Sequence, residues 1–317
     1  MDPTFPTHYR AHGKLMFTGE YAVLDGALAL ALPTRFGQEL EVIYPPQAQE
    51  GWLSWQSYDA DGNCWFDAIY LLPEATYEEG LDDVAGHKLE ALLHAVQRQR
   101  PHVWSNMKGA AVTTRLDFPR HWGLGTSSTL IANMANWLQV DAYKLLHDTF
   151  GGSGYDLACA NADGPILYQL IGGIPHHVEF PYLPAYRHQL YFVYLGKKQS
   201  SQDAIRHYLA GGERVAPLIT AISAITAQWL AARTLAELAD CIRRHENMLA
   251  EILHLPRAKT LYFSDFWGEI KSLGAWGGDF VLVTSERPLE ETRAYFNDKG
   301  YDVVLTYDDM MGTPPGL

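Results

Sequence analysis

The chain has 317 residues, a length that suits one large domain or two fused domains rather than a single small core. Hydrophobic residues make up 47% and charged residues 19%, a composition that excludes disordered, collagen-like and coiled-coil proteins. The formal net charge is −13 and the sequence contains no run of Lys and Arg, so we expect neither a nucleic-acid partner nor a membrane partner.

The three cysteines Cys64, Cys159 and Cys241 are widely spaced and match no zinc or redox motif. Their odd number argues against a disulfide framework, so we expect free thiols in a reducing compartment. The first residues lack the basic and apolar regions of a signal peptide. A prominent apolar run at residues 27–32 is far shorter than the roughly 18 residues that a membrane span needs. We therefore expect a cytoplasmic protein.

The first half of the chain mixes strands with helices. Strands are expected at 13–18, 39–44, 110–116 and 165–170, with a buried segment at 27–32. Helices are expected at 81–98, at the apolar stripe of 130–138 and at about 141–150. Residues 59–63 predict a hairpin turn; a calcium loop is disfavoured because its Gly is misplaced and no Glu closes it.

The second half is richer in helices. Strands are expected at 189–195, 280–284 and 303–306, and helices at 202–210, 216–232, 235–253, around 263–272 and at 289–297. His176 and His177 are placed in a turn before a strand, and residues 312–317 in a loose tail. Two prolines within 181–187 separate the strand-rich part from the helix-rich part. The sequence thus predicts an α+β protein in two lobes.

Three segments that contain glycine could carry chemistry: Gly13–Gly26, Gly123–Ser128 and Gly274–Asp279. In the second segment, glycines allow backbone N–H groups to converge, hydroxyls add donors, and a helix N-terminus follows. These features predict a phosphate-binding loop, although a plain glycine loop with a Ser or Thr helix cap fits the local sequence equally well. The Walker, dinucleotide-binding and protein-kinase motifs are all absent.

Together and in this order, the three segments resemble the GHMP kinase superfamily, which includes galactokinase, homoserine kinase, mevalonate kinase and phosphomevalonate kinase. Residues Gly123–Ser128 are similar to the family's Gly-Leu-Gly-Ser-Ser-Ala phosphate loop. Gly19-Glu20-Tyr21 in the first segment is closer to phosphomevalonate kinases, because mevalonate kinases usually have His after the Glu. The third segment resembles a Gly-Ala-Gly-Gly-Gly-Asp stretch of the same branch, with Trp276 in place of a glycine.

Two shorter stretches extend this resemblance, which covers the chain from Gly13 to about Thr306. Residues 196–201 are similar to a Gly-Lys-x-x-Ser-Thr stretch of phosphomevalonate kinases. Residues 153–158 resemble a bacterial subgroup named for its Gly-Tyr-Asp-Ile-Ala signature. The resemblance implies a two-lobed GHMP kinase fold: an N-terminal α/β lobe at 1–184 that carries the phosphate loop, and a C-terminal ferredoxin-like lobe at 185–311.

The resemblance also implies the site. It assigns Asp156 the role of catalytic carboxylate, Lys14 that of its neighbour, and Ser127 the hydroxyl on the metal side of the phosphate loop. A carboxylate can orient the attacking hydroxyl and take its proton, and a lysine can keep that acid ionised and offset phosphate charge. The alternatives without a catalytic role are that Asp156 caps a helix or lies in a turn and that Lys14 is a solvated residue at the end of a strand. The expected phosphate-binding loop consists of Gly123, Leu124, Gly125, Thr126, Ser127 and Ser128. The expected substrate-binding or lobe-interface positions are Glu20, Tyr21, Lys197, Ser200, Gly274, Trp276, Gly277 and Gly278.

Two departures from the family pattern bear on this site. Mevalonate kinases carry a metal-binding Glu on the helix before the catalytic Asp, whereas residues 145–148 contain only Asp148, which is out of register. Trp276 adds bulk where the family needs close backbone approach, so it either caps a small substrate pocket or fills the lobe interface.

These features predict a small-molecule kinase that uses ATP and Mg²⁺ and acts on mevalonate or phosphomevalonate, as a monomer or homodimer. Lys197, Lys198 and Arg35 could supply the extra cations that a phosphorylated acceptor needs. One alternative is an enzyme like mevalonate-diphosphate decarboxylase, which shares this fold. The other is a non-catalytic nucleotide-binding protein of the same fold.

Overall fold

The computed structural model describes residues 6–197, 208, 215–274, 276 and 278–312. The chain forms two compact units: the first comprises residues 1–13, 36–120 and 125–161, and the second comprises 14–35, 121–124 and 162–317. The expected helix at 202–210, Lys198 and most of the expected loose tail lie outside the described residues. The expected lobe boundary at 184/185 stays a prediction.

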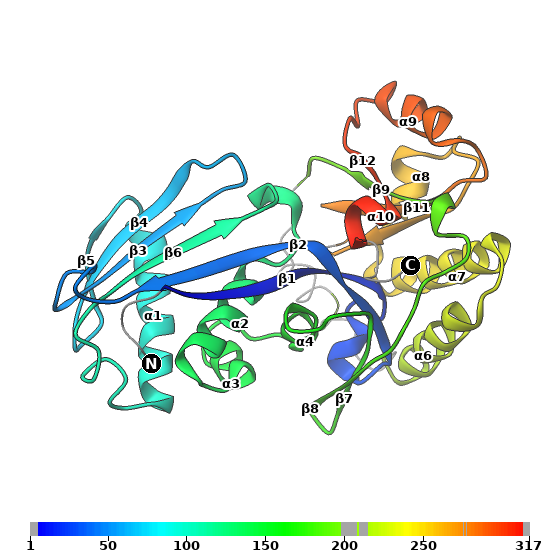
Figure 1. The fold of residues 1–317 in the computed structure, drawn as a ribbon. Coiled ribbons are helices and arrows are strands. Elements are labelled where there is room, and N and C mark those ends of the chain that lie inside the picture. The colour runs from blue at the N-terminus through cyan, green and yellow to red at the C-terminus, as the bar shows by residue number, and fades with distance from the viewer. Residues whose placement is uncertain (1–5, 198–207, 209–214, 275, 277, 313–317) are drawn as a thin grey trace. The chain divides into compact units, whose positions relative to one another are not determined.

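The first unit is a sheet covered by helices (Figure 1). Its strand order is β5 (Thr76–Gly80), β4 (Cys64–Leu71), β3 (Trp52–Tyr58), β6 (Ala110–Leu116) and then β2 (Ala29–Ile43), which pairs with β1 (Thr7–Thr18). Strands β3 and β6 run parallel, and the other neighbours of this order are antiparallel. Helices α1 (Asp83–Gln99), α2 (Thr126–Leu138), α3 (Ala142–His147) and α4 (Tyr155–Ala160) complete the unit, with the short helix η2 at Arg120–Trp122 on its border.

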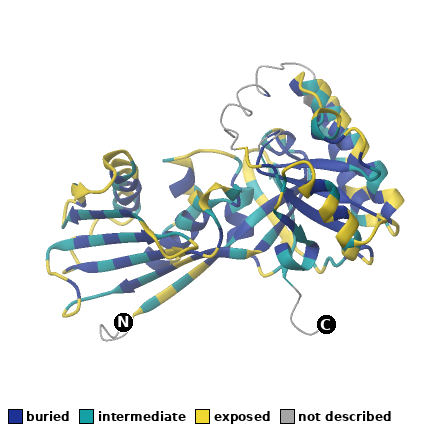
Figure 2. Cartoon of the chain, turned by 90° about the horizontal axis from the view of Figure 1, so that it is seen from above, coloured by how far each residue is buried: buried dark blue, intermediate teal, exposed yellow. Residues whose placement is uncertain are grey.

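Local sequence explains several boundaries of the first unit. The Asp59 carboxylate accepts hydrogen bonds from the backbone N–H groups of Asp61 and Asn63, at 3.0 and 2.9 Å, and so closes the β3–β4 hairpin as predicted. The side chain of Asp82 caps α1 by accepting a hydrogen bond from the N–H group of Ala85. Buried and less buried residues alternate along β3 and β4 (Figure 2), as expected for strands with one face on a core.

The second unit contains a four-stranded antiparallel sheet in the order β10 (Ile270–Leu273), β11 (Phe280–Thr284), β9 (Leu190–Tyr194) and β12 (Val304–Thr306). The N-terminal part of β2 also lies in this unit, where it pairs with β7 (Ile166–Ile171), which pairs with β8 (Ile174–Glu179). Its helices are η1 (Ala22–Asp25), η3 (Arg187–Gln189), α6 (Val215–Ala231), α7 (Leu235–Leu253), α8 (Ala258–Tyr262), α9 (Leu289–Asn297) and α10 (Tyr307–Met311).

Two predictions of secondary structure are wrong. The expected helix around 263–272 is instead an irregular segment that follows α8, and then the first residues of strand β10. Phe263, Phe266 and Trp267 have helical spacing, but their rings form an aromatic cluster with α9, and Gly268 lies so close to Thr284 that a Cβ there would be 1.7 Å from its carbonyl oxygen. His176 and His177 lie within β8 rather than in a turn before a strand.

Other predictions agree with the structure. The expected strands at 110–116 and 280–284 and the expected helix at 289–297 match β6, β11 and α9. The buried run at 27–32 contributes the start of β2, whose residues Ala29–Leu32 are buried. Within the described residues, no helix combines the length and apolarity needed to cross a membrane.

Candidate active site

Gly123 is the point in the second unit where the three glycine-bearing segments meet. The backbone N–H of Lys14 in β1 donates to the carbonyl oxygen of Leu124 at 2.9 Å, and Lys14 Nζ donates to that of Gly123 at 3.2 Å. From the third segment, the buried carboxylate of Asp279 packs on Gly123, where a Cβ would lie 2.2 Å from Asp279 Oδ2. With φ at +69°, this position favours glycine in two independent ways.

The first and third segments are also joined directly. The backbone N–H of Trp276 donates to the hydroxyl of Tyr21 at 2.9 Å. Tyr21 has φ of 62° and ψ of −51°, a strained conformation for a bulky residue, and its ring stacks on Tyr208 with centroids 5.9 Å apart. The surrounding contacts therefore hold Tyr21 in a backbone conformation that it would not adopt alone.

Helix α2 begins directly after this meeting point. Its N-cap is Gly125, with φ of 96°, and no side chain of the described residues caps the helix there. The hydroxyl of Ser128 turns back to donate to the carbonyl oxygen of Gly125 at 2.8 Å, whereas Ser127 is exposed and Thr126 half-buried. The first-turn N–H groups and the positive end of the helix dipole thus remain available to an anion.

Asp156 lies in the first turn of α4, in the first unit. Its side chain is half-buried, and its Oδ1 accepts a hydrogen bond from the N–H group of Leu157 at 3.2 Å. Burial, followed by the nearby charge of Asp156, raises the pKa of Tyr143 to about 12. Asp156 is therefore a partly accessible carboxylate near Tyr143, and its expected pairing with Lys14 stays a prediction.

A buried charge cluster, formed by Glu20, His245, Glu246 and Lys271, lies in the second unit. Lys271 Nζ donates to Glu20 Oε1 and to the carbonyl oxygen of Ser272, the latter at 3.0 Å, and lies 3.7 Å from Glu246 Oε1. The four side chains are between 0 and 6% exposed, so water screens their charges little. One lysine faces two carboxyl groups, which leaves one of them without a full counter-charge.

Burial decides the protonation of this cluster. It raises the pKa of Glu246 to about 7, against the opposing charge of Lys271, and it raises the pKa of Glu20 as well. Burial and then the charge of Lys271 lower the pKa of His245 well below its usual range, so the imidazole is neutral. Its Nε2 accepts a hydrogen bond from the N–H group of Gly19 at 3.1 Å, which places the ring proton on Nδ1.

The buried charge cluster ties the first segment to the third. Glu20 lies within the first segment, and Lys271 lies on β10, three residues before Gly274. His245, Glu246 and Lys271 are not among the site residues predicted from the sequence. A signal was present nevertheless: His245 and Glu246 occupy the apolar stripe of α7 between Ile242 and Leu249, where a solvated pair is not expected.

The remaining expected site residues have individual surroundings. Trp276 is 7% exposed, packs in an apolar cluster with Tyr21 and Tyr208, and donates from Nε1 to the carbonyl oxygen of Pro256 at 3.1 Å. These contacts favour a packing role for Trp276 within the second unit. Lys197 Nζ lies 4.0 Å from the ring centroid of Tyr262.

The Lys197 carbonyl oxygen accepts a hydrogen bond from the N–H group of Asp279 at 2.8 Å, so the 196–201 stretch begins beside the third segment. Gly274 has φ of 73° and also faces the Asp279 carboxylate, and Gly278 lies in the bend before β11. Ser200 and Gly277 lie outside the described residues.

No preformed metal cage of three or more His, Cys, Asp or Glu side chains is present among the described residues. Asp148 forms an ion pair with Arg98 at 3.7 Å. The exposed hydroxyl of Ser127 on the first turn of α2 fits a Mg²⁺ ion that is bound mainly through nucleotide phosphates, because Mg²⁺ keeps several waters and needs few protein ligands.

Comparisons with known proteins identify the fold. No family model and no curated protein matches the sequence. Among solved structures, phosphomevalonate kinase from Streptococcus pneumoniae in complex with phosphomevalonate and AMPPNP is similar, with 15% identity, a TM-score of 0.67, and coverage of 95% of this chain and 99% of that one.

Two further kinases are similar over nearly their whole lengths. Galactokinase from Lactococcus lactis complexed with galactose has 10% identity, a TM-score of 0.69, and coverage of 96% and 94% of the two chains. Mevalonate kinase from L. major in complex with R-mevalonate has 15% identity, a TM-score of 0.63, and coverage of 95% and 94%. The chain therefore has the GHMP kinase fold that the motifs implied.

Proposed function

We propose that this protein is an ATP-dependent phosphotransferase that acts on a small metabolite. The observation that carries the proposal is the meeting of the three glycine-bearing segments at Gly123, directly before the uncapped N-terminus of α2. A plain glycine loop would need neither a lysine on its carbonyl oxygen nor a carboxylate packed on its Cα atom. Both features fit a loop whose backbone is held ready for the phosphates of a nucleotide.

The residues then divide the work of phosphoryl transfer. The N–H groups of residues 125–128 bind the phosphates, and Lys14 offsets negative charge on the transferred group. Asp156 orients the acceptor hydroxyl and takes its proton as the hydroxyl oxygen bonds to the γ-phosphorus and the bond from that phosphorus to the leaving ADP breaks. The Ser127 hydroxyl would lie on the protein side of a Mg²⁺ ion bound mainly through the phosphates, and that ion would supply charge neutralisation on the nucleotide.

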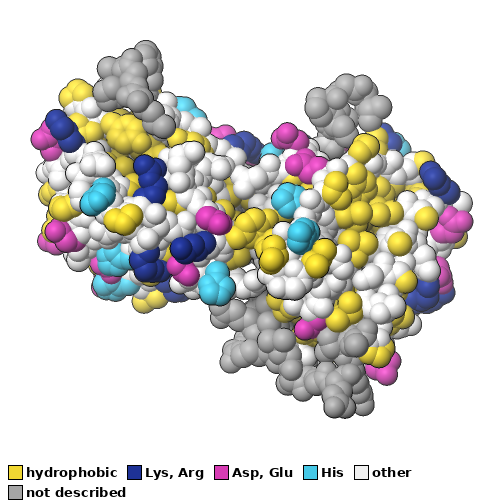
Figure 3. All heavy atoms as spheres, turned by 90° about the horizontal axis from the view of Figure 1, so that it is seen from below, with side chains coloured by type: hydrophobic (Ala, Val, Ile, Leu, Met, Phe, Trp, Pro, Cys, Tyr) yellow, Lys and Arg dark blue, Asp and Glu magenta, His cyan; other side chains and the backbone are white. Residues whose placement is uncertain are grey.

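Mevalonate and phosphomevalonate are the first acceptors to test. The Gly19-Glu20-Tyr21 form of the first segment supports this choice, as do the names of two similar structures. The galactokinase neighbour has a TM-score at least as high, which keeps sugars on the same list. On the face seen in Figure 3, Lys and Arg side chains are interspersed with acidic and histidine side chains, a pattern compatible with a small-molecule substrate.

The test is a coupled ADP-release screen with ATP and Mg²⁺ over mevalonate, phosphomevalonate, homoserine, galactose and other simple sugars, together with a no-acceptor blank. We expect one acceptor to raise ADP release well above the blank. Release of CO₂ in equal amount to ADP from mevalonate diphosphate would instead identify a decarboxylase. ATP binding without acceptor-dependent ADP release from any of these compounds would favour the non-catalytic alternative.

A further inference from the structure

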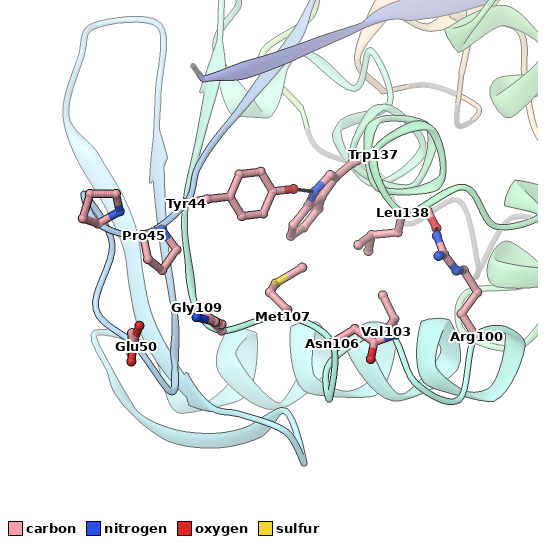
Figure 4. Close-up of a pocket in the computed structure, with 12 residues that line it drawn as sticks. Tyr44, Pro45, Glu50, Arg100, Val103, Asn106, Met107, Gly109, Trp137 and Leu138 are labelled. Carbon is pink, nitrogen blue, oxygen red and sulfur yellow. Dashed lines mark hydrogen bonds between the residues drawn. The ribbon is translucent and has the colours of Figure 1, made fainter. Parts of the chain in front are cut away.

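A pocket of about 730 Å³ lies in the first unit, between the C-terminal ends of α1 and α2 and the segment that follows the end of β2 (Figure 4). Its walls are mainly apolar, and their apolar lining residues include Tyr44, Pro45, Val103, Met107, Trp137 and Leu138. This volume and lining are typical of pockets that bind small organic molecules. No residue of this pocket belongs to the expected nucleotide or acceptor site.

The pocket is distinct from the proposed phosphate site. Trp137 and Leu138 are the last residues of α2, whereas the phosphate loop precedes its first residue, Thr126. At a rise of about 1.5 Å per residue, the two ends of this helix lie about 18 Å apart. A nucleotide bound at the start of α2 and a molecule bound at its end can therefore be present together.

Contacts within the first unit hold the pocket walls in place. Trp137 Nε1 donates to the Tyr44 hydroxyl at 2.8 Å, and the Trp137 ring packs on Trp55 and Trp104 with centroids 6.3 and 6.4 Å away. At the other wall, Arg100 Nη1 donates to the Leu138 carbonyl oxygen at 2.6 Å. A molecule that enters would thus meet an ordered site and lose little free energy to reorganisation.

The charges along the pocket are unequal at its two ends. Glu50 and Arg100 lie at opposite ends in Figure 4. The backbone of Lys108 lies at the Glu50 end, because its carbonyl oxygen accepts a hydrogen bond from the N–H group of Gly51 at 2.6 Å. One basic and one acidic residue therefore line that end. No acidic residue lines the Arg100 end, where the guanidinium has donors beyond the one bound to Leu138.

We propose that this pocket binds a small amphipathic anion. Its planar or branched apolar body lies against Tyr44, Met107 and Trp137, and its carboxylate or sulfonate accepts hydrogen bonds from Arg100. The site is independent of the phosphate loop, so it does not depend on the proposed kinase activity.

The experiment compares two fluorescent probes that differ in charge: 1-anilinonaphthalene-8-sulfonate, an anion, and N-phenyl-1-naphthylamine, its neutral analogue. Each is titrated against the full chain. We expect Arg100→Gln to weaken binding of the anion about tenfold, the scale of one charge-assisted hydrogen bond. Arg100→Lys should keep most of the affinity. Lys108→Gln is the matched control, because it removes the same charge at the other end and should change affinity less than twofold.

The neutral probe and ATP complete the test. Arg100→Gln should leave binding of the neutral probe unchanged, and Met107→Trp, which fills the pocket, should weaken both probes. Saturating ATP with Mg²⁺ should displace neither. The proposal is overturned if Arg100→Gln and Lys108→Gln weaken the anion equally, if both probes respond equally to Arg100→Gln, or if ATP displaces the anion. Because ATP binding is measured separately on the same samples, failure here leaves the kinase proposal unaffected.

Discussion

Replacing Gly123 by alanine tests whether the three glycine-bearing segments depend on one another. At a φ of +69°, an alanine costs about 1–2 kcal/mol relative to glycine. Its Cβ would also lie 2.2 Å from Asp279 Oδ2, and overpacking of this kind costs about 1–3 kcal/mol. We therefore expect Gly123→Ala to lower the free energy of unfolding by about 2–5 kcal/mol in urea denaturation.

A double-mutant cycle separates the two costs. Asp279→Gly removes the side chain that the new Cβ meets, so the double variant should recover about 1–3 kcal/mol compared with the sum of the single effects. The φ cost should remain. Asp279→Asn is the matched control, because it keeps the shape of the side chain and should rescue nothing. Additive effects in the Gly123→Ala/Asp279→Gly double variant would refute the packing of the third segment on the phosphate loop.

Three other predictions concern the charge cluster and the phosphate loop. Glu246 has a pKa of about 7 in the folded protein and releases its proton near pH 4.5 in the unfolded chain. As pH rises through this window, the free energy of unfolding relative to the Glu246→Gln variant should therefore fall by about 3 kcal/mol, and it should level off above the window. A difference that does not change with pH in urea denaturation would contradict the argument that burial raises this pKa. Gly125→Val should abolish the rise in melting temperature caused by ATP, since ligand at 100 times its Kd contributes about 2.7 kcal/mol; an unchanged shift would make the loop a plain helix start. Lys271→Met should lower the free energy of unfolding by about 3–5 kcal/mol, because it leaves Glu20 buried without its cation. Adding Glu20→Gln to that variant should recover part of this loss. No recovery in thermal or urea unfolding would argue against the ion pair.

Sequence patterns correctly predicted helices and strands whose spacing of apolar residues follows from burial along that element alone. The run Phe280–Thr284, rich in β-branched residues, is a strand buried on both faces, and Leu289–Asn297 forms a helix with the predicted bounds. The pattern misled at 263–272, because aromatic residues three and four positions apart can pack on each other in an irregular segment as well as on a helix face. There, the close approach of Gly268 to β11 decided the structure, and this contact is remote in sequence.

The candidate site likewise contains one part that the sequence predicted and one part that it did not. Glycine spacing indicated all three segments, since positive φ is a local demand on the backbone. The buried charge cluster was missed because its members come from the turn after β1, from α7 and from β10, and only the tertiary fold brings Glu20, Glu246 and Lys271 together. The presence of His245 and Glu246 in the apolar stripe of α7 could have indicated a buried polar cluster. This pattern does not show which residues elsewhere in the chain contact them.

The most direct test of the kinase proposal is transfer of the γ-phosphoryl group from ³²P-labelled ATP to the acceptor found in the screen, measured for the native chain and for Asp156→Asn. Asparagine is nearly isosteric with aspartate but cannot take the acceptor's proton. We predict a fall in transfer rate of about 10²–10⁴-fold for Asp156→Asn, with the melting temperature and ATP affinity nearly unchanged. A variant that transfers phosphate at the native rate, or one that loses activity only in proportion to lost folded protein, would contradict the assignment of Asp156 as the catalytic carboxylate.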